Sequence, residues 1–525
     1  MLKMTKKIIL KNCTIYPLDS PAIKNGIVII NGSLIEYVGH DMRSIATDSN
    51  IKAVDLQGKP VFPGFCDSHT HLVMAAEQKD VINFIGCYDF QELKSKIQNK
   101  IISNPKQSWI TGYGWELEKI IVPGGNYLKA FDKLAPAHNI FLISKDYHSA
   151  WINTNAYNKI IKNLNCSNVI QYKDGEPTGL IFEDIIELKK TIIPPLSKKS
   201  LFKNLKNIIC DFHKCGITSI HNNENIYYFN ILKDYYKIAN QKLNILWNAD
   251  IKKPDQITEL NKFFKFRNKW IQPGGIKLFM DGALGSLTGF MSNPYLGTQS
   301  HGILNIDKNK LEKWLKASVN HKIPEVVFHT IGDAATELVL KTARNYKDIK
   351  LRLEHVQFLS EKILNDYDLS NVTFSCQPSH MWGDRIIAEN NLDRIDREHG
   401  YMYNSMIEKS GLIVFGSDYP IEIINPWKGI QAAVTRMKTP SESAWNNSEA
   451  ITLSQAIKAH TLYPASLYDN PFNTGTITVG KIADLTVLNH DPFDFYLKRP
   501  YELWETIKSV LTISHGKIVY SDIQM

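Results

Sequence analysis

Short apolar runs recur through the middle of this chain, and most of them are followed by a segment that favours a helix, such as 333–346 or 426–437. Repeated alternation of strands and helices predicts a parallel sheet covered by helices. Eight repeats are the number that closes a (β/α)8 barrel of the TIM type, an α/β fold. The eight predicted strands are 61–65, 217–221, 244–250, 275–280, 326–329, 351–355, 372–376 and 412–416.

The two ends of the chain differ from this middle, because both are rich in strand-like runs. Asn31-Gly32 separates two such runs near the N-terminus and predicts a hairpin, since a type I′ turn needs positive φ at both central residues. Similar runs occur at 475–479, 483–488 and 507–520. We therefore expect residues 1–59 and 471–525 to form one small β-sandwich domain beside a barrel of residues 60–470.

The first two predicted strands lie too far apart for a single crossover. Structureless loops longer than about 15 residues are uncommon in compact domains. Residues of about 73–205 are therefore predicted to form an inserted subdomain within the barrel, which we expect to cover one rim.

Composition limits the classes of function. The 525 residues are 43% hydrophobic and 22% charged, as in globular proteins, and the net charge of +8 comes from scattered lysines. We expect no nucleic-acid partner and no membrane association, because the chain has no basic cluster and no long apolar stretch. The seven cysteines include no C-x-x-C pair, which argues against a disulfide framework. A cytoplasmic enzyme with a small-molecule substrate is expected, and a homodimer stays open.

His69 and His71 are the most informative pair of residues in the chain. Alternate side chains of an extended strand point to the same side, so this spacing aims two imidazoles at one point. Neutral imidazole is the commonest metal ligand among side chains. In a chain with 16 histidines such a pair also arises by chance. From this motif alone, two solvent-exposed histidines at the end of a strand are as plausible as a metal site.

Other polar residues follow or end later predicted strands. Taken singly, each has an ordinary explanation, such as a hydrogen-bonded histidine, a lysine that reaches water or a helix cap. Together they fall on the carboxyl-terminal rim of the predicted barrel, where such barrels build their active sites. These residues are Lys277, His329, His355 and Asp418.

With these motifs the sequence resembles the amidohydrolase superfamily over nearly its whole length. More narrowly it resembles the YtcJ-like branch, which includes N-substituted formamide deformylases. The superfamily is indicated by the segments 63–71, 416–418 and 480–485. The branch is indicated by the segments 112–115, 148–153, 177–179, 281–286, 294–295 and 377–378.

The resemblance implies a role for each rim residue. His69 and His71 would bind the more buried metal ion, with Asp418 touching it, and His329 and His355 would bind a second ion. Lys277 would be a carbamylated lysine that bridges both. The implied cofactor is one or two divalent ions, most often Zn²⁺. An unmodified Lys277 beside a single ion stays open.

The implied reaction is hydrolysis of a non-peptide carbon–nitrogen bond, of the amide or N-substituted formamide type, by hydroxide that the metal supplies. Asp418 would be the catalytic residue that carries the proton. Trp115 and His148 are candidate substrate contacts from the insertion, although ordinary packing explains them equally well.

Other reactions of the same scaffold stay open, among them deamination, lactone hydrolysis and isomerisation, as does an inactive binding protein. Gly332 stands where nucleobase deaminases of the superfamily carry a glutamate, which argues against deamination. Leu287 stands where relatives of the branch often carry an arginine.

Overall fold

The structure is a computed structural model, in which the chain divides into two compact units. Unit 1 consists of Met1–Val73 together with Leu205–Met525, and unit 2 is Met74–Asn204. The insertion predicted at about 73–205 has nearly the same limits as unit 2. The structure describes residues 7–40, 51–79, 81–106, 108–115, 120, 122, 125–144, 149–163, 170–182, 192–410 and 412–523.

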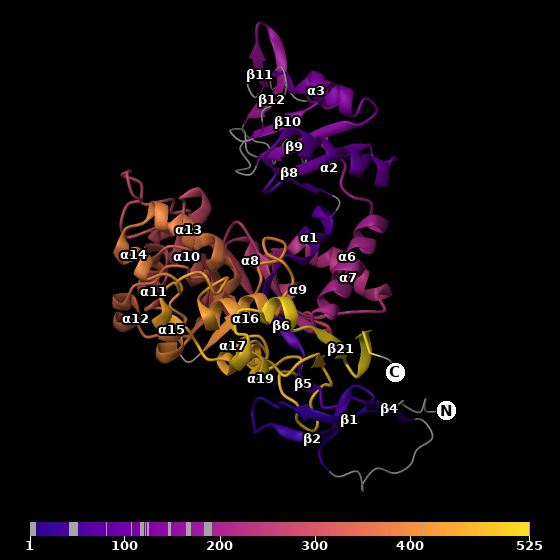
Figure 1. The fold of residues 1–525 in the computed structure, drawn as a ribbon. Helices are drawn as coiled ribbons and strands as arrows, with labels where there is room; N and C mark the ends of the chain where they lie inside the picture. The colour runs from indigo at the N-terminus through magenta and orange to yellow at the C-terminus, as the bar shows by residue number, and fades with distance from the viewer. Residues whose placement is uncertain are drawn as a thin grey trace. The chain divides into compact units, whose positions relative to one another are not determined.

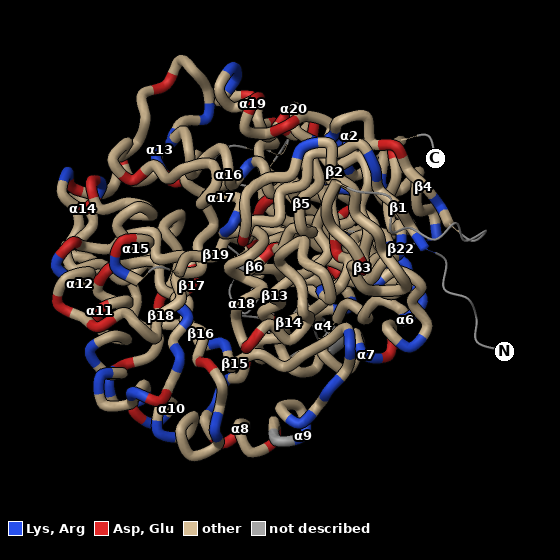
Figure 2. Tube along the Cα trace, turned by 90° about the horizontal axis from the view of Figure 1, so that it is seen from below, with Lys and Arg blue, Asp and Glu red and all other residues tan. Residues whose placement is uncertain are grey.

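Unit 1 contains an eight-stranded parallel sheet whose strands stand in chain order. In Figure 2 these strands follow one another around a ring. They are largely buried, as expected for parallel strands covered on both faces. The strands are β6 (Phe65–Thr70), β13 (Ile217–Asn225), β14 (Asn244–Asp250), β15 (Ile271–Phe279), β16 (Glu325–Thr330), β17 (Lys350–His355), β18 (Val372–Cys376) and β19 (Ile413–Phe415).

The ring closes just beyond the end of β19. Thr70 forms a parallel bridge to Tyr419, and the His71 amide donates to the Tyr419 carbonyl at 2.8 Å. The Asp418 amide donates to the His69 carbonyl, also at 2.8 Å. The backbone that carries three of the predicted metal ligands is therefore itself the closing seam of a TIM-type barrel.

The predicted first barrel strand, 61–65, is wrong. Its residues belong to two different sheets: β5 (Pro60–Pro63) joins the sheet of the chain ends, and the barrel strand β6 begins at Phe65. Gly64 lies between them against β13, where an added Cβ would come within 2.3 Å of Thr218 Oγ1. One apolar run can serve two sheets because the chain turns at a residue without a side chain.

The helices of unit 1 include the two that the sequence predicted, which are α11 (Asp333–Ala343) and α16 (Pro426–Thr435). Asn425 caps α16 by accepting from the Trp427 amide, and Pro426 occupies the first turn. No helix among the described residues is long and apolar enough to cross a membrane. The helices that follow β13 are α7 (Ile226–Ile238), α8 (Gln256–Glu259), α9 (Asn261–Phe264), α10 (Lys308–Asn320), α11 (Asp333–Ala343), α12 (Glu361–Asp366), α13 (Met381–Asn391), α14 (Arg394–Glu398), α15 (Tyr403–Ser410), α16 (Pro426–Thr435), α17 (Leu453–Ala459), α18 (Leu462–Ser466), α19 (Pro492–Lys498) and α20 (Leu503–Thr506).

Both ends of the chain contribute to a second sheet of unit 1, as the sequence predicted. Strand β20 pairs antiparallel with β5, and Figure 1 shows the yellow C-terminal strands beside the indigo N-terminal ones. The hairpin turn is Gly32-Ser33, one residue later than predicted. The strands form one continuous sheet, so the sandwich form of the prediction is not confirmed. They are β1 (Lys7–Ile15), β2 (Ile23–Asn31), β3 (Leu34–Gly39), β4 (Ile51–Asp55), β5, β20 (Leu485–Leu488), β21 (Ser509–Ser514) and β22 (Lys517–Ser521).

Unit 2 has its own core on both faces of a six-stranded sheet. Along one of its strands, Ile140 and Leu142 enter one hydrophobic cluster, whereas Phe141 and Ile143 enter the other. This period of two is that of a strand buried on both sides. Its elements are β7 (Ile82–Asn83), α2 (Phe90–Ser103), β8 (Trp109–Trp115), α3 (Tyr127–Leu134), β9 (Asn139–Ser144), β10 (Ser149–Ile152), α4 (Thr154–Asn163), β11 (Ile170–Lys173) and β12 (Glu176–Phe182), while α1 (Leu72–Gln78) and α6 (Lys198–Lys214) each begin in one unit and end in the other.

Candidate metal centre

The barrel rim brings together groups that lie far apart in the sequence. One ligand atom each of His69, His355 and Asp418 lies within 4.8 Å of the others, and all three residues are buried. His71 joins them, because its Nε2 lies 3.0 Å from Asp418 Oδ1, while Nε2 of His69 lies 3.4 Å from the same oxygen. The H-x-H motif therefore aims both imidazoles at one point, as the strand geometry predicts.

A hydrogen bond to Nδ1 fixes the orientation of each of the two rings, His69 and His71. His71 Nδ1 lies 2.7 Å from the Asn223 carbonyl oxygen, which can only accept, so this nitrogen carries a proton. His69 Nδ1 lies 2.6 Å from a carboxylate oxygen of Glu354. Each ring then turns its Nε2 toward Asp418 Oδ1. Burial opposes a charge on His71, but Asp418 and Glu224 raise its pKa above the ordinary value. A proton or a cation must lie between such a nitrogen and the carboxylate, so a divalent ion could take the place of the proton here.

Glu354 is a supporting residue that the sequence interpretation missed. It has no exposed surface, and Arg352 Nε lies 2.7 Å from its second oxygen. Burial opposes ionisation of Glu354, but Arg352, His69 and Lys277 hold its pKa below the ordinary value. The available signal was the alternation Leu-Arg-Leu-Glu in a strand, which places two charged side chains on the same face of β17.

Replacing Glu354 by glutamine tests this support. We expect Glu354→Gln to weaken metal binding about 10–100-fold, because partners that orient a ligating histidine contribute that much to affinity. The dissociation constant is measured by competition with a chelating dye, and circular dichroism checks that the variant is folded. Glu502→Gln, at an exposed ion pair with Arg499, serves as the control and should bind metal normally. Unchanged affinity in folded Glu354→Gln would show that the carboxylate does not support the site.

Lys277 is buried at the end of β15, and its Nζ has no hydrogen-bond partner among the described residues. Burial lowers the pKa of Lys277 to about 8, although Glu354 and Asp418 partly counteract this. A fraction of the amine is therefore neutral near physiological pH. A neutral amine is the form that can react with carbon dioxide, so the residue is compatible with the carbamate that the resemblance implies.

His329 and His355 form the other side of the group, with ring centroids 4.5 Å apart. His329 Nε2 lies 2.9 Å from the Gly282 carbonyl oxygen and so carries the proton, which leaves Nδ1 free to coordinate. His355 Nδ1 is buried, and no described residue forms a hydrogen bond with it. Burial lowers the pKa of both residues, to about 3 for His329. Both imidazoles are therefore neutral, which is the form that binds metals.

Backbone conformation at the rim is unusual. His355 and Asp418 both have positive φ, of 73° and 58°. Residues other than glycine rarely adopt such angles, and those that do are concentrated at functional sites. The Asp418 side chain is mostly buried, and although burial alone would raise its pKa, His69 and His71 hold the pKa below the usual range. Asp418 is thus an ionised carboxylate facing the histidines.

A second buried carboxylate ties down the loop that follows His329. Asp281 accepts from the amides of Ile331 and Gly332, at 3.0 and 2.9 Å, and from that of Phe290 at 3.0 Å. The sequence marked Asp281 only as part of a motif. Its role in the structure is to hold the backbone beside His329.

Of the two predicted substrate contacts, Trp115 and His148, the structure describes only Trp115. Trp115 lies in the core of unit 2, fully buried, where it stacks on Trp151 with ring centroids 3.6 Å apart. Its indole N–H donates to the Leu142 carbonyl at 2.7 Å. Trp115 therefore has a packing role in this structure. His148 lies outside the described residues.

The donor set fits a divalent metal. Imidazole nitrogens with one carboxylate are typical ligands of Zn²⁺. His355 Nδ1 and Lys277 Nζ are buried polar atoms without a hydrogen-bond partner among the described residues, and such groups are rare unless a ligand satisfies them.

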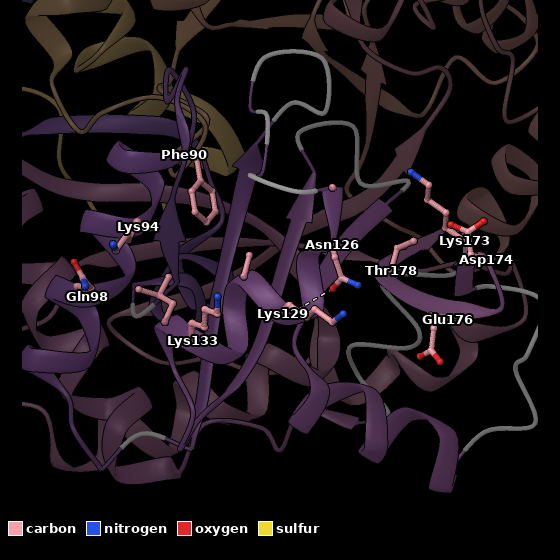
Figure 3. A pocket seen from close by; sticks show the side chains of 13 residues that line it. Phe90, Lys94, Gln98, Asn126, Lys129, Lys133, Lys173, Asp174, Glu176 and Thr178 are labelled. Carbon is pink, nitrogen blue, oxygen red and sulfur yellow. Dashed lines mark hydrogen bonds between the residues drawn. The ribbon is translucent and has the colours of Figure 1, made fainter.

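Unit 2 has a cavity of about 740 Å³ that is of a different kind (Figure 3). Lysine is the commonest residue of its polar lining, which also has Asp174 and Glu176 on the β11–β12 hairpin. The described residues that line it include no histidine or cysteine. The volume of a cavity therefore does not identify the candidate reactive site. The site is identified by the histidines and the carboxylate that converge at the barrel rim.

Comparison with known proteins agrees with this geometry. The model of the amidohydrolase family matches residues 52–520. The chain is 26% identical over 480 residues to the protein named "Putative amidohydrolase YtcJ" of Bacillus subtilis (strain 168), covering 89% of this chain and 90% of that protein. It is 22% identical over 502 residues to the N-substituted formamide deformylase of Arthrobacter pascens, covering 89% and 90%. A crystal structure of an uncharacterized metal-dependent hydrolase from Pyrococcus horikoshii OT3 superposes with a TM-score of 0.79 at 22% identity, covering 95% of this chain and 99% of the other.

Proposed function

The chain belongs to the amidohydrolase family, and on that premise we propose that it hydrolyses a non-peptide carbon–nitrogen bond of a small molecule, of the amide or N-substituted formamide type. The observation that carries the proposal is the convergence of histidine rings and an ionised Asp418 from separate strands of one barrel rim. A family relative named as an N-substituted formamide deformylase supports the choice of bond.

The residues of this chain would divide the work as follows. His69, His71, His329, His355 and Asp418 would hold one or two divalent ions, most readily Zn²⁺. A bound divalent ion supplies a water of pKa near 7 and polarises the substrate carbonyl. Asp418 would take the proton of the attacking water and deliver it to the departing nitrogen. An amide nitrogen leaves poorly as an anion, so it needs this proton.

Gly332 favours hydrolysis over nucleobase deamination. An added Cβ at this position would lie 2.0 Å from the Phe290 carbonyl oxygen, so no side chain fits here without movement of the backbone. The glutamate that nucleobase deaminases of the superfamily place at this position therefore has no room. The reaction we propose needs no group there.

A hydrolysis screen with added Zn²⁺ tests the function. The panel contains N-formyl, N-acyl, carbamate and lactone compounds, with a dipeptide and an aminopurine as rivals. We expect turnover of an amide or formamide that is lost on treatment with a chelator and restored by Zn²⁺. Turnover of the lactone, dipeptide or aminopurine alone would replace the proposed bond by that of the active compound.

Lys277→Met tests whether the lysine bridges two ions. We expect the variant to hold one ion per chain where the wild type holds two, because a thioether cannot form a carbamate. Metal per chain is measured by plasma mass spectrometry. Lys252→Met is a matched control, since Lys252 also lies near the Phe279 ring, at 5.1 Å, but is exposed. Two ions in Lys277→Met, or one in the wild type, would remove the bridging role.

A further inference from the structure

His380 lies at the same rim but outside the set of predicted ligands. It ends η4 (Pro378–His380), a short 3-10 turn that connects β18 to α13. β18 is the seventh strand of the barrel, so η4 leaves the rim on which the metal ligands stand. The mechanism described above gives His380 no task.

The ring of His380 faces the candidate ligands. It is nearly parallel to the ring of His355, at an angle of 16° and a centroid distance of 6.3 Å. His380 is also among the groups that hold the pKa of Asp418 down, after the larger effects of His69 and His71. The residue therefore lies close to two of the groups that would surround the reacting bond.

His380 Nε2 is shielded from solvent and has no hydrogen-bond partner among the described residues, although the residue as a whole is partly exposed. The side-chain oxygen of the neighbouring Gln377 is also buried, and no residue in the described part of the chain forms a hydrogen bond with it. Buried polar atoms are nearly always hydrogen-bonded, so an unpaired one at a candidate site indicates a missing ligand.

The support of His380 is firm. The backbone amide of His380 donates to the Gln377 carbonyl at 3.1 Å. One turn further on, Asp384 accepts from Gln357 Nε2 at 2.6 Å and from the Tyr401 hydroxyl. These bonds fix the start of α13 against the segment that follows β17 and against the residues between α14 and α15. A side chain on such a support can be held within the narrow geometric limits that a binding site needs.

His380 is not placed as a metal ligand. Its ring centroid lies 6.3 Å from that of His355, whereas the rings of His69 and His329 lie 4.9 and 4.5 Å from the His355 ring. We propose that His380 binds the substrate, with Nε2 hydrogen-bonded to a polar atom next to the bond that is cleaved. This inference rests on the proposed function and assigns a substrate-binding residue to its site.

The test compares His380→Leu, which removes the hydrogen bond, with His380→Gln, which can restore one. His321→Leu, at a partly exposed histidine that ends α10, is the control. Each variant is loaded with Zn²⁺ and measured for metal per chain, for kcat/KM on the best compound of the hydrolysis screen, and for the dissociation constant of benzohydroxamate by calorimetry. The hydroxamate measurement does not depend on turnover.

We expect full metal content in all variants. In His380→Leu, kcat/KM should fall about 100-fold, as when a hydrogen bond to the reacting group is removed, and hydroxamate should bind about tenfold more weakly. His380→Gln should recover at least part of both losses. Unchanged kcat/KM and hydroxamate binding in His380→Leu would overturn the inference, and so would a loss of metal in parallel with activity, which would make His380 a ligand. A wild type that neither holds Zn²⁺ nor turns over any compound would overturn the proposed function and this inference with it.

Discussion

The double variant His69→Ala with His71→Ala is expected to lose its metal and all measurable hydrolysis while the barrel stays folded. Both rings turn Nε2 toward Asp418 Oδ1, at 3.4 and 3.0 Å, so their removal takes two nitrogen ligands from one point. The closing seam should survive, because it is made by the backbone of His69, His71, Asp418 and Tyr419.

Metal per chain, turnover and circular dichroism are measured on the same preparations. His321→Ala with His399→Ala is the control, since these histidines are partly exposed and neither is in the group of close ligand atoms found among the described residues. The control should keep both metal and activity. Full turnover in the His69/His71 variant would end the proposal of a metal centre at this rim.

Asp418→Asn is expected to lower kcat by about 10²–10⁴, the usual worth of general acid–base catalysis. Asparagine keeps the shape and can still offer an oxygen to a metal, but it cannot carry the proton. Metal content and KM should therefore change little, which is the pattern of an interaction made only in the transition state.

The comparison variant is Asp494→Asn, which changes an exposed carboxylate. Steady-state kinetics and metal analysis on both variants separate chemistry from binding. A loss of less than about tenfold in kcat would mean that another group moves the proton. His148 and Glu183, both outside the described residues, would then be the next candidates.

The barrel strands were predictable because strands buried on both faces read as continuous apolar runs. The predicted 244–250 and 372–376 coincide with β14 and β18. The first strand was misplaced because the run before His69 supplies two sheets, and nothing in its composition marks the change at Gly64. Only the neighbouring Thr218, about 150 residues later, makes that change visible.

The candidate ligands could be selected from the sequence because they recur at one end of several predicted strands. The residues that hydrogen-bond to these candidate ligands could not be predicted. Glu354 reaches His69 across 285 residues of sequence, and Asn223 reaches His71 through a backbone carbonyl that has no sequence signature. His380 was overlooked because its neighbour in the fold is His355, on another strand. These residues come together only when the strands of the barrel are assembled.

Barrel and metal ligands are shared by enzymes of many reactions, and loops choose the molecule. Within this site, the geometry of Gly332 and of His380 limits which substrates can bind. The first excludes a side chain beside His329, and the second leaves a nitrogen for a polar group of the substrate.

The most direct test of a metal centre is anomalous X-ray diffraction from crystals of the Zn²⁺-loaded protein, recorded on both sides of the zinc absorption edge. The account predicts one or two anomalous peaks at the barrel rim, one of them about 2.0–2.1 Å from Nε2 of both His69 and His71 and in contact with Asp418. Zinc peaks confined to other parts of the molecule, or no peak at the rim in a protein that binds zinc, would contradict it.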